Sequence, residues 1–231
     1  MCGRATLSKK PKELEKRYQA TFEFNMEAVN AVLPSYNIAP THWHPVITND
    51  QPQQLQLFKW GLIPSWAKDS AIASRLINAR IETIADKPAF KAIHARRCLI
   101  PFDGFYEWKT VGKQKIPYRI VVKDQTIFSA AGIWETWYAP SGKQLSTFSI
   151  LTQAPNELMA TIHNRMPAIL TQAQETIWLD TEILTKDVLS IITPYPSELM
   201  EAYQVSPRVG KVSNNDARLI ARDFPRQGSL F

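Results

Sequence analysis

The chain has 231 residues, 45% of them hydrophobic, which is enough for a sizeable buried core. Its net charge of +6 is compatible with a polyanionic partner. No apolar run is long enough to cross a membrane, and the first residues lack the apolar segment of a signal peptide. We therefore expect a cytoplasmic protein.

Cys2 and Cys98 are the two cysteines, a number that fits a reducing compartment and excludes a disulfide scaffold. Cys98 begins the apolar run Cys98-Leu99-Ile100, so we expect it to be a small buried hydrophobe. The four histidines have no paired Cys/His spacing, so the sequence predicts neither a metal site nor a cofactor.

The elements follow from periodicity and turn residues. Residues 11–22 are predicted to form an amphipathic helix, and the proline-containing stretch 33–40 must be turn or extended. Strands are predicted at residues 46–48, 55–60, 98–102, 118–122, 127–134 and 147–152. Helical patterns fall at residues 81–86, 156–162, 171–180 and 186–192, the third opening with the capping-box spacing of Thr171 and Gln174.

Strands outnumber helices in this order and do not alternate with them as a doubly wound parallel sheet requires. The prediction is an α+β fold with a mainly antiparallel core, barrel-like or a sandwich, and short flanking helices. No linker or repeat divides the chain, so we expect a single domain over residues 1–231, with a core at about 2–216 and a basic tail at 217–231.

Cys2 becomes an unusual reagent if Met1 is removed, as is common before a small residue. The residue then carries a free α-amine and a thiol, which have nucleophilic forms near neutral pH. The amine can form a Schiff base with an aldehyde, and the thiol can close on the imine carbon to give a five-membered thiazolidine. Taken alone, an incidental Met-Cys-Gly start is about equally compatible with the sequence.

Three polar segments offer groups that could serve Cys2. Glu107 lies among aromatic residues, where desolvation would raise its pKa, although a water-facing position on a strand is the simpler interpretation. His163 and Arg165 could move a proton and hold a phosphate, or be structural. Asn78 and Arg80 share one face if their segment is extended, as on any surface strand.

Tryptophans stand at both ends of the stretch WGLIPSW, residues 60–66. Tryptophan can stack on the bases of single-stranded nucleic acid or fill the core. We expect Trp60 to be buried and Trp66 to be more available.

Together these pieces resemble the SRAP family, the SOS-response-associated peptidases that sense abasic sites. The matching stretches, in the family's order, are MCGR at 1–4, YNIAP at 36–40, WGLIP at 60–64, NAR at 78–80, GFYEW at 104–108, IHNRMP at 162–167 and VSPRV at 205–209. They cover the chain to about Asp216, and residues beyond about Arg218 look like a basic, weakly structured tail.

The resemblance implies a role for each matching residue. Cys2 would form the thiazolidine link, Asn78 would orient the Cys2 end, Glu107 would shuttle protons, and His163 would assist proton transfer and reversal. Arg4, Arg80 and Arg165 would contact phosphates of the DNA. Trp66 would wedge against a stack of bases, and Asn37 and Pro40 would shape the wall of the pocket. The word peptidase implies self-removal of Met1.

The function implied is capture of abasic sites in single-stranded DNA, including sites at junctions with duplex, by a covalent crosslink that shields the lesion. Weak lyase chemistry by β-elimination from the Schiff base would accompany it. The resemblance further implies action on DNA in the SOS response, with nucleoid association when bound. The sequence has no heptad repeat, so we expect a monomer, and we expect neither a membrane nor a metal partner.

Two other functions stay open on the residues. A glutamine amidotransferase of the N-terminal-cysteine class also begins Met-Cys-Gly, but it would need a synthetase-like domain for which this chain is too short. A non-covalent single-stranded-DNA-binding module would leave Cys2 incidental.

Overall fold

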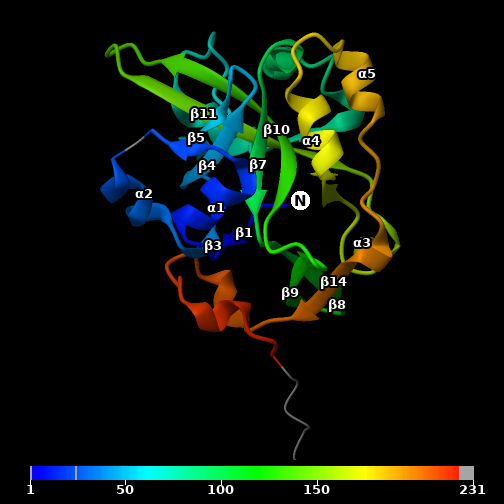
Figure 1. The fold of residues 1–231 in the computed structure, drawn as a ribbon. Coiled ribbons are helices and arrows are strands. Elements are labelled where there is room, and N and C mark those ends of the chain that lie inside the picture. Colours follow the sequence, from blue (N-terminus) through cyan, green and yellow to red (C-terminus); the bar gives the residue numbers. More distant parts are fainter. Residues whose placement is uncertain (1, 24, 224–231) are drawn as a thin grey trace, which may run out of the picture.

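The structure is a computed structural model that describes residues 2–23 and 25–223 (Figure 1). Its described part combines two β-sheets with short helices, so the predicted α+β class is confirmed. In this part of the chain, no helix is long and apolar enough to span a membrane.

The smaller sheet is antiparallel throughout and carries the beginning of the chain. Its strands, in spatial order, are β14 (Met200–Gln204), β9 (Gln114–Val122), β8 (Gly104–Val111), β1 (Ala5–Leu7) and β3 (Ser35–Ile38). Ala5 on β1 is opposite Phe105 on β8 and Ile38 on β3. The strand that follows Cys2 is therefore held on both sides.

The larger sheet contains a closed ring of strands. The ring is formed by β4 (Trp43–Thr48), β5 (Gln51–Trp60), β11 (Gln144–Gln153), β10 (Phe128–Tyr138) and β7 (Arg97–Phe102). It closes because β5 pairs in parallel with β11, and the other pairs of the ring are antiparallel. Of the two expected forms of the core, the structure therefore has the barrel-like one.

Short strands extend this barrel at its edges. They are β2 (Thr21–Phe22), β6 (Asn78–Arg80), β12 (Met166–Pro167) and β13 (Ile169–Leu170). The strand β6 pairs in parallel with β11, with Asn78 opposite Ile150 and Arg80 opposite Thr152. This pairing brings the predicted Asn78 and Arg80 to the barrel wall.

The helices are short and flank the sheets. The α-helices are α1 (Pro11–Tyr18), α2 (Met26–Val32), α3 (Glu157–Ala160), α4 (Gln172–Leu179) and α5 (Thr185–Ser190). The 3₁₀ turns are η1 (Ser70–Arg75), η2 (Ile81–Thr83), η3 (Pro88–His94), η4 (Ser197–Leu199), η5 (Pro207–Gly210) and η6 (Ala217–Ile220). Figure 1 shows α4 and α5 on one side of the barrel and α2 on the opposite side.

The predicted strands are all present, and the capping box of Thr171 and Gln174 begins α4 as expected. The first predicted helix is too long, because α1 ends at Tyr18 and Gln19 adopts a left-handed conformation with φ 51°. Residues Thr21–Phe22 instead pair with β5. The helix predicted at residues 81–86 is reduced to the single turn η2, which ends shortly before Pro88.

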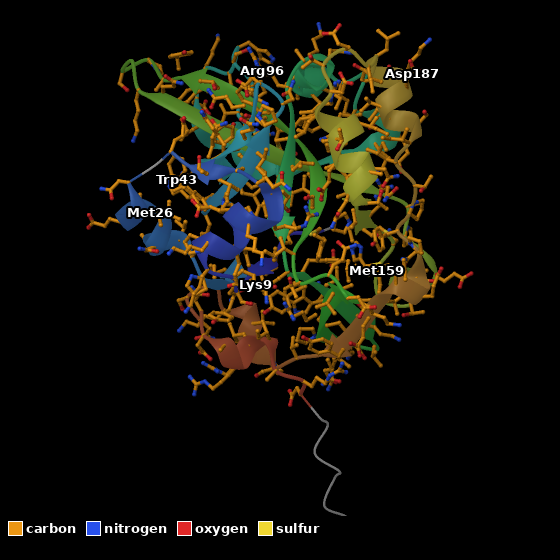
Figure 2. All side chains as sticks on the ribbon, viewed as in Figure 1. Lys9, Met26, Trp43, Arg96, Met159 and Asp187 are labelled. Atoms are coloured by element: carbon orange, nitrogen blue, oxygen red, sulfur yellow. The ribbon has the colours of Figure 1, made fainter. Side chains whose placement is uncertain are left out.

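The helix α2 was not predicted, and it leaves apolar groups at the surface. Met26 and Trp43 are each 44% exposed and lie at the same edge of the molecule (Figure 2). The sequence feature that indicates the start of α2 is Asn25, whose side chain caps the helix by accepting a hydrogen bond from the Glu27 amide at 2.9 Å.

The chain after β14 is ordered further than expected. Leu219 on η6 is fully buried against Tyr106, together with Val205 and Val209. The tail expected from residue 217 therefore begins as a packed turn, and residues 224–231 lie outside the described part of the chain.

Candidate functional site

Cys2 lies fully buried just before β1. Its backbone carbonyl accepts a hydrogen bond of 2.8 Å from the Asn78 side-chain amide, which comes from β6 on the other sheet. Burial raises the pKa of the Cys2 thiol far above its usual range, and the nearby Glu107 carboxylate raises it further. The thiol is therefore held in its protonated form at neutral pH, and Met1 lies outside the described residues.

Asn78 is positioned by the parallel pairing of β6 with β11. Its neighbour Ala79 is fully buried on one face of the strand. Asn78, which is half-buried, and Arg80, which is exposed, are both on the other face. The predicted sharing of one face by Asn78 and Arg80 is thus confirmed. The Asn78 Oδ1 atom is buried and has no hydrogen-bond partner in residues 2–23 and 25–223.

Glu107 on β8 is 3% exposed, so the simpler interpretation of a water-facing strand residue is wrong. Its Oε1 lies 4.0 Å from Nδ1 of His163. Burial raises the pKa of the Glu107 carboxyl, and the neighbouring His163 partly offsets this effect. A buried carboxyl next to a histidine is a combination of the kind that serves in general acid–base catalysis.

His163 follows α3 in the loop before β12. Its Nδ1 accepts a hydrogen bond of 3.0 Å from the backbone amide of Arg165. A neutral ring whose Nδ1 accepts carries its proton on Nε2. Glu107 and His163 line one pocket of about 560 Å³ together with Trp108, Thr110, Lys115 and Gly210.

Arg165 is bound to an acidic partner that the sequence analysis did not single out. Its two terminal nitrogens contact the two Glu82 carboxylate oxygens at 2.6 and 2.9 Å, and one of them also donates to the Thr152 carbonyl at 2.6 Å. The hydrogen bonds from Arg165 lower the pKa of Glu82, and the positive charge of Arg80 lowers it further. Arg80, Arg165 and Glu82 therefore form one charged cluster beside β11.

Arg4 is tied to the end of the described chain. Its guanidinium donates to Asn37 Oδ1 at 2.7 Å and to the Val209 carbonyl at 2.6 Å, and it lies 5.7 Å from the Trp108 ring centre. Asn37 is 1% exposed, and its amide nitrogen donates to backbone carbonyls of η5 and the segment after it, including that of Asn214 at 2.8 Å. Both residues thus tie β1 and β3 to the segment around η5.

Pro40 and Trp66 are two further predicted site residues that lie in loops. Pro40 is partly exposed in the turn between β3 and β4. Trp66 is 60% exposed in the loop after β5, whereas Trp60 is 1% exposed and donates to the Ile77 carbonyl at 2.9 Å. The expected difference between the two tryptophans is confirmed, as is the burial of Cys98.

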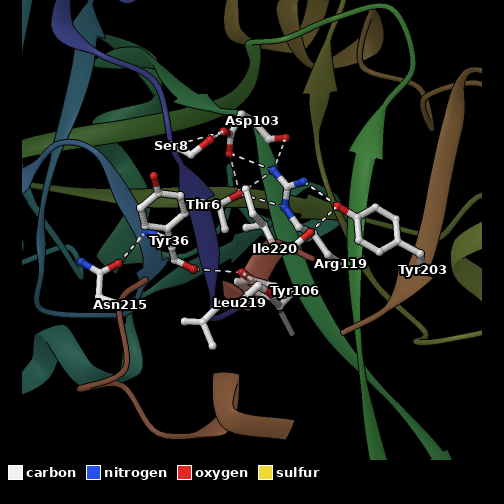
Figure 3. Close-up of polar contacts among 10 residues, drawn as sticks. All are labelled: Thr6, Ser8, Tyr36, Asp103, Tyr106, Arg119, Tyr203, Asn215, Leu219 and Ile220. Atoms are coloured by element: carbon white, nitrogen blue, oxygen red, sulfur yellow. Dashed lines mark hydrogen bonds and ion pairs between the residues drawn. The ribbon is translucent and has the colours of Figure 1, made fainter. Parts of the chain in front are cut away.

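A buried polar network fixes β1 behind the site (Figure 3). Asp103 accepts from the Thr6 hydroxyl at 2.5 Å and from the Ser8 amide at 2.9 Å, and it pairs with Arg119 at 3.1 Å. Arg119 also donates to the Tyr203 hydroxyl at 2.7 Å. The network joins β1, β9 and β14, so the strand that follows Cys2 has one defined position.

Comparison with known proteins shows the family of this chain. The model of the SOS response associated peptidase (SRAP) family matches residues 1–212. The chain belongs to the SRAP family. The abasic site processing protein YoqW of Bacillus subtilis (strain 168) is 44% identical over 224 residues, 95% of this chain and 99% of that protein.

More distant members and a solved structure extend the family relationship. The abasic site processing protein HMCES of Xenopus tropicalis is 31% identical over 223 residues, 81% of this chain and 66% of that protein. A crystal structure of a protein from Bacteroides thetaiotaomicron is 35% identical, with a TM-score of 0.90, and the match covers 96% of this chain and 100% of that one.

Several residues of the site escaped the sequence analysis. Glu82 could have been noticed as an acidic residue two positions after Arg80, but nothing local indicates its pairing with Arg165. Asp103 and Arg119 are 16 residues apart in the sequence and meet only through the β8–β9 hairpin. Among the described residues, no group of His, Cys, Asp or Glu side chains is arranged to hold a metal ion.

Proposed function

We propose that this chain processes abasic sites in single-stranded DNA, including sites at junctions with duplex, by crosslinking to them through Cys2. The observation that carries the proposal is the 2.8 Å hydrogen bond from the Asn78 side-chain amide to the Cys2 carbonyl, beside the Glu107–His163 pair. The relatives named abasic site processing proteins support the same substrate. The chain acts as a monomer in this proposal. It also removes its own Met1, which the word peptidase in the family description supports.

The first step opens the abasic sugar. The closed hemiacetal breaks its C1′–O4′ bond, the ring oxygen gains a proton, and the C1′ hydroxyl loses one to give the aldehyde. Glu107 is suited to donate that proton because burial raises the pKa of its carboxyl. His163, which lies 4.0 Å away, can accept or return a proton through Glu107.

The second step joins Cys2 to the sugar. The Cys2 amine bonds to C1′, one water molecule leaves, and a Schiff base results. The thiol then adds across the C=N bond, so that sulfur bonds to C1′ and its proton passes to nitrogen. Burial keeps the thiol protonated, and its addition closes the thiazolidine before β-elimination can cut the strand. Because the thiol captures the Schiff base in this way, the lyase activity that accompanies the crosslink is weak.

Asn78 would hold both ends of the reacting residue. Its amide nitrogen already donates to the Cys2 carbonyl, and its buried Oδ1 is without a hydrogen-bond partner in the described part of the chain. A buried acceptor normally finds a donor, and we assign to it the amine that removal of Met1 creates. Holding this amine near C1′ makes the attack effectively intramolecular.

The DNA backbone would be bound by the charged cluster beside β11. Arg80 is exposed there, and Arg165 can exchange the Glu82 carboxylate for a phosphate, which presents the same two-oxygen geometry. The exposed Trp66 would wedge against a base stack, and Arg4, Asn37 and Pro40 would shape the wall and place the lesion.

A denaturing gel tests the proposal. Protein whose mass confirms the loss of Met1 is mixed with single-stranded DNA that contains one abasic site, with and without borohydride. The wild type should give a shifted band without reductant. The C2A variant should give a band only after borohydride, because its amine can form a Schiff base but no thiol can close the ring.

The matched control is C98A, which removes the other cysteine, buried in the barrel at β7. This variant should crosslink like the wild type once its fold is verified by circular dichroism. A trimmed wild type that gives no band would refute covalent capture, and a non-covalent DNA-binding module would then be the better description. A C2A variant that gives the wild-type band without reductant would show that a residue other than Cys2 forms the crosslink.

A further inference from the structure

The pocket that contains Glu107 and His163 extends beyond them. It is also lined by Trp108, Thr110 and Lys115 of the β8–β9 hairpin and by Gly210 of η5, and its volume of about 560 Å³ is typical of a ligand site. An abasic sugar has no base, so the reacting group fills only part of such a space. The extension therefore has room for a further part of the ligand.

The two strands of the hairpin place Lys115 beside this extension. Thr110 and Lys115 are directly opposite each other, and Trp108 is opposite Pro117. Residues two apart on a strand share a face, so Trp108, Thr110 and Lys115 are on the same side of the hairpin. Glu107 alternates to the other face of β8, and the pocket borders both its carboxyl and this row.

The one charged side chain of this row is the Lys115 ammonium. Residues 108–123 include no aspartate or glutamate. Lys115 is exposed and forms no ion pair with any residue in the described part of the chain. Its ammonium group is thus free to bind an anion at the mouth of the pocket.

The other side of the extension is open at Gly210. A Cβ built on Gly210 would meet no atom within 4 Å, so the η5 backbone borders free space. Trp108 is half-buried, and its indole is held beside the Arg4 guanidinium, 5.7 Å from the ring centre. An aromatic ring such as Trp108 near a cation such as Lys115 is the combination that binds a base and its phosphate in single-stranded nucleic acid.

We propose that the space between the β8–β9 hairpin and η5 is a binding subsite for the nucleotides that flank the abasic site on one side. The Lys115 ammonium binds a phosphate, and the Trp108 indole contacts the adjoining base. Recognition there is independent of sequence, because a phosphate and an aromatic face are common to every nucleotide. The inference rests on the proposed function, since the subsite begins at the groups that react with the lesion.

Two asymmetric oligonucleotides test the subsite. Each has one abasic site, with a single-stranded flank only on the 5′ side or only on the 3′ side. The oligonucleotide concentration that half-saturates crosslinking is measured over a range of salt for the wild type, K115Q and K113Q. Lys113 is the matched control because it is an exposed lysine of the same hairpin that does not line the pocket.

We expect K115Q to weaken binding about three- to tenfold at low salt, for one of the two oligonucleotides only. For that oligonucleotide the slope of log affinity against log salt should fall by about 0.7, the value for one phosphate contact on a single strand. K113Q should leave both quantities unchanged. K115Q behaving like K113Q, or weakening both oligonucleotides equally, would overturn the subsite.

Binding of undamaged single-stranded DNA, measured by fluorescence anisotropy with the same variants, separates the two proposals. If the trimmed wild type forms no crosslink, the proposed function fails. A Lys115-dependent salt slope on undamaged DNA would then still support the subsite, and its absence would overturn the subsite as well.

Discussion

Glu107 illustrates how strongly one residue depends on its surroundings. Its neighbours in the sequence favour a water-facing strand position, yet β8 places the carboxyl 3% exposed and 4.0 Å from His163. Burial favours the neutral acid, so the pKa of Glu107 is raised. A carboxyl of this kind is costly to ionise, and the cost falls on the folded state alone.

This cost predicts a pH-dependent difference between the wild type and E107Q. Because the folded pKa of Glu107 is above its unfolded value of roughly 4.3, its contribution to stability is full below that value and is lost as the pH rises through the folded pKa. Urea unfolding from about pH 4 to pH 7 should therefore show E107Q gaining stability relative to the wild type as the pH rises.

The control is E82Q, for which the sign is opposite. The hydrogen bonds from Arg165 lower the pKa of Glu82, so its contribution is present above the unfolded pKa and lost as the pH falls through the folded one. Equal pH profiles for E107Q and the wild type would show that Glu107 ionises without cost in the folded protein.

At the scale of elements, the position of β1 depends on a buried ion pair rather than on its own short sequence. Three residues make a weak strand, and Asp103 and Arg119 join this one to β9 and β14 (Figure 3). The Arg119 guanidinium lies across Gly104, where a Cβ would come within 2.7 Å of its Nε. A glycine is required there because the arginine occupies the space of a side chain.

G104A should therefore destabilise the protein by about 1–3 kcal/mol, the usual effect of forcing an extra methyl group into a packed site. Chemical denaturation measures the loss. G210A is the matched control, because its methyl group would enter open space, and it should change stability by less than about 0.5 kcal/mol. Equal effects of the two variants would mean that Arg119 moves aside freely.

For the whole molecule, the beginning and end of the described chain stabilise each other. Arg4 donates to the Val209 carbonyl across 205 residues, and Leu219 packs on Tyr106, which is next to Glu107 in β8. The end of the chain thus forms part of the wall of the site. In Figure 1 this segment lies against the end of the molecule that contains β1 and β3.

L219A should lower the free energy of unfolding by about 2–5 kcal/mol, because it leaves a cavity in a buried cluster. L199A is the control at a leucine that is 44% exposed, and it should cost about 0.5 kcal/mol or less. Thermal or urea unfolding distinguishes the two. A loss for L219A no greater than that for L199A would contradict the packing of η6.

The sequence by itself determined the local features of this protein. The strand segments, the capping box at Thr171, the buried Trp60 and the shared face of Asn78 and Arg80 each depend on neighbours a few residues away, so periodicity and spacing predict them. The chemistry available to Cys2 likewise follows from its place after Met1. The resemblance to the SRAP family rested on short motifs of the same kind.

Only the tertiary structure decided which of these groups meet and in what environment. The burial of Glu107, the pairing of Arg165 with Glu82 and the tie between Arg4 and Val209 join residues far apart in the chain. Desolvation and charge act through space, so no local pattern reveals them. The early end of α1 has a similar cause, since β2 gains its hydrogen bonds from β5.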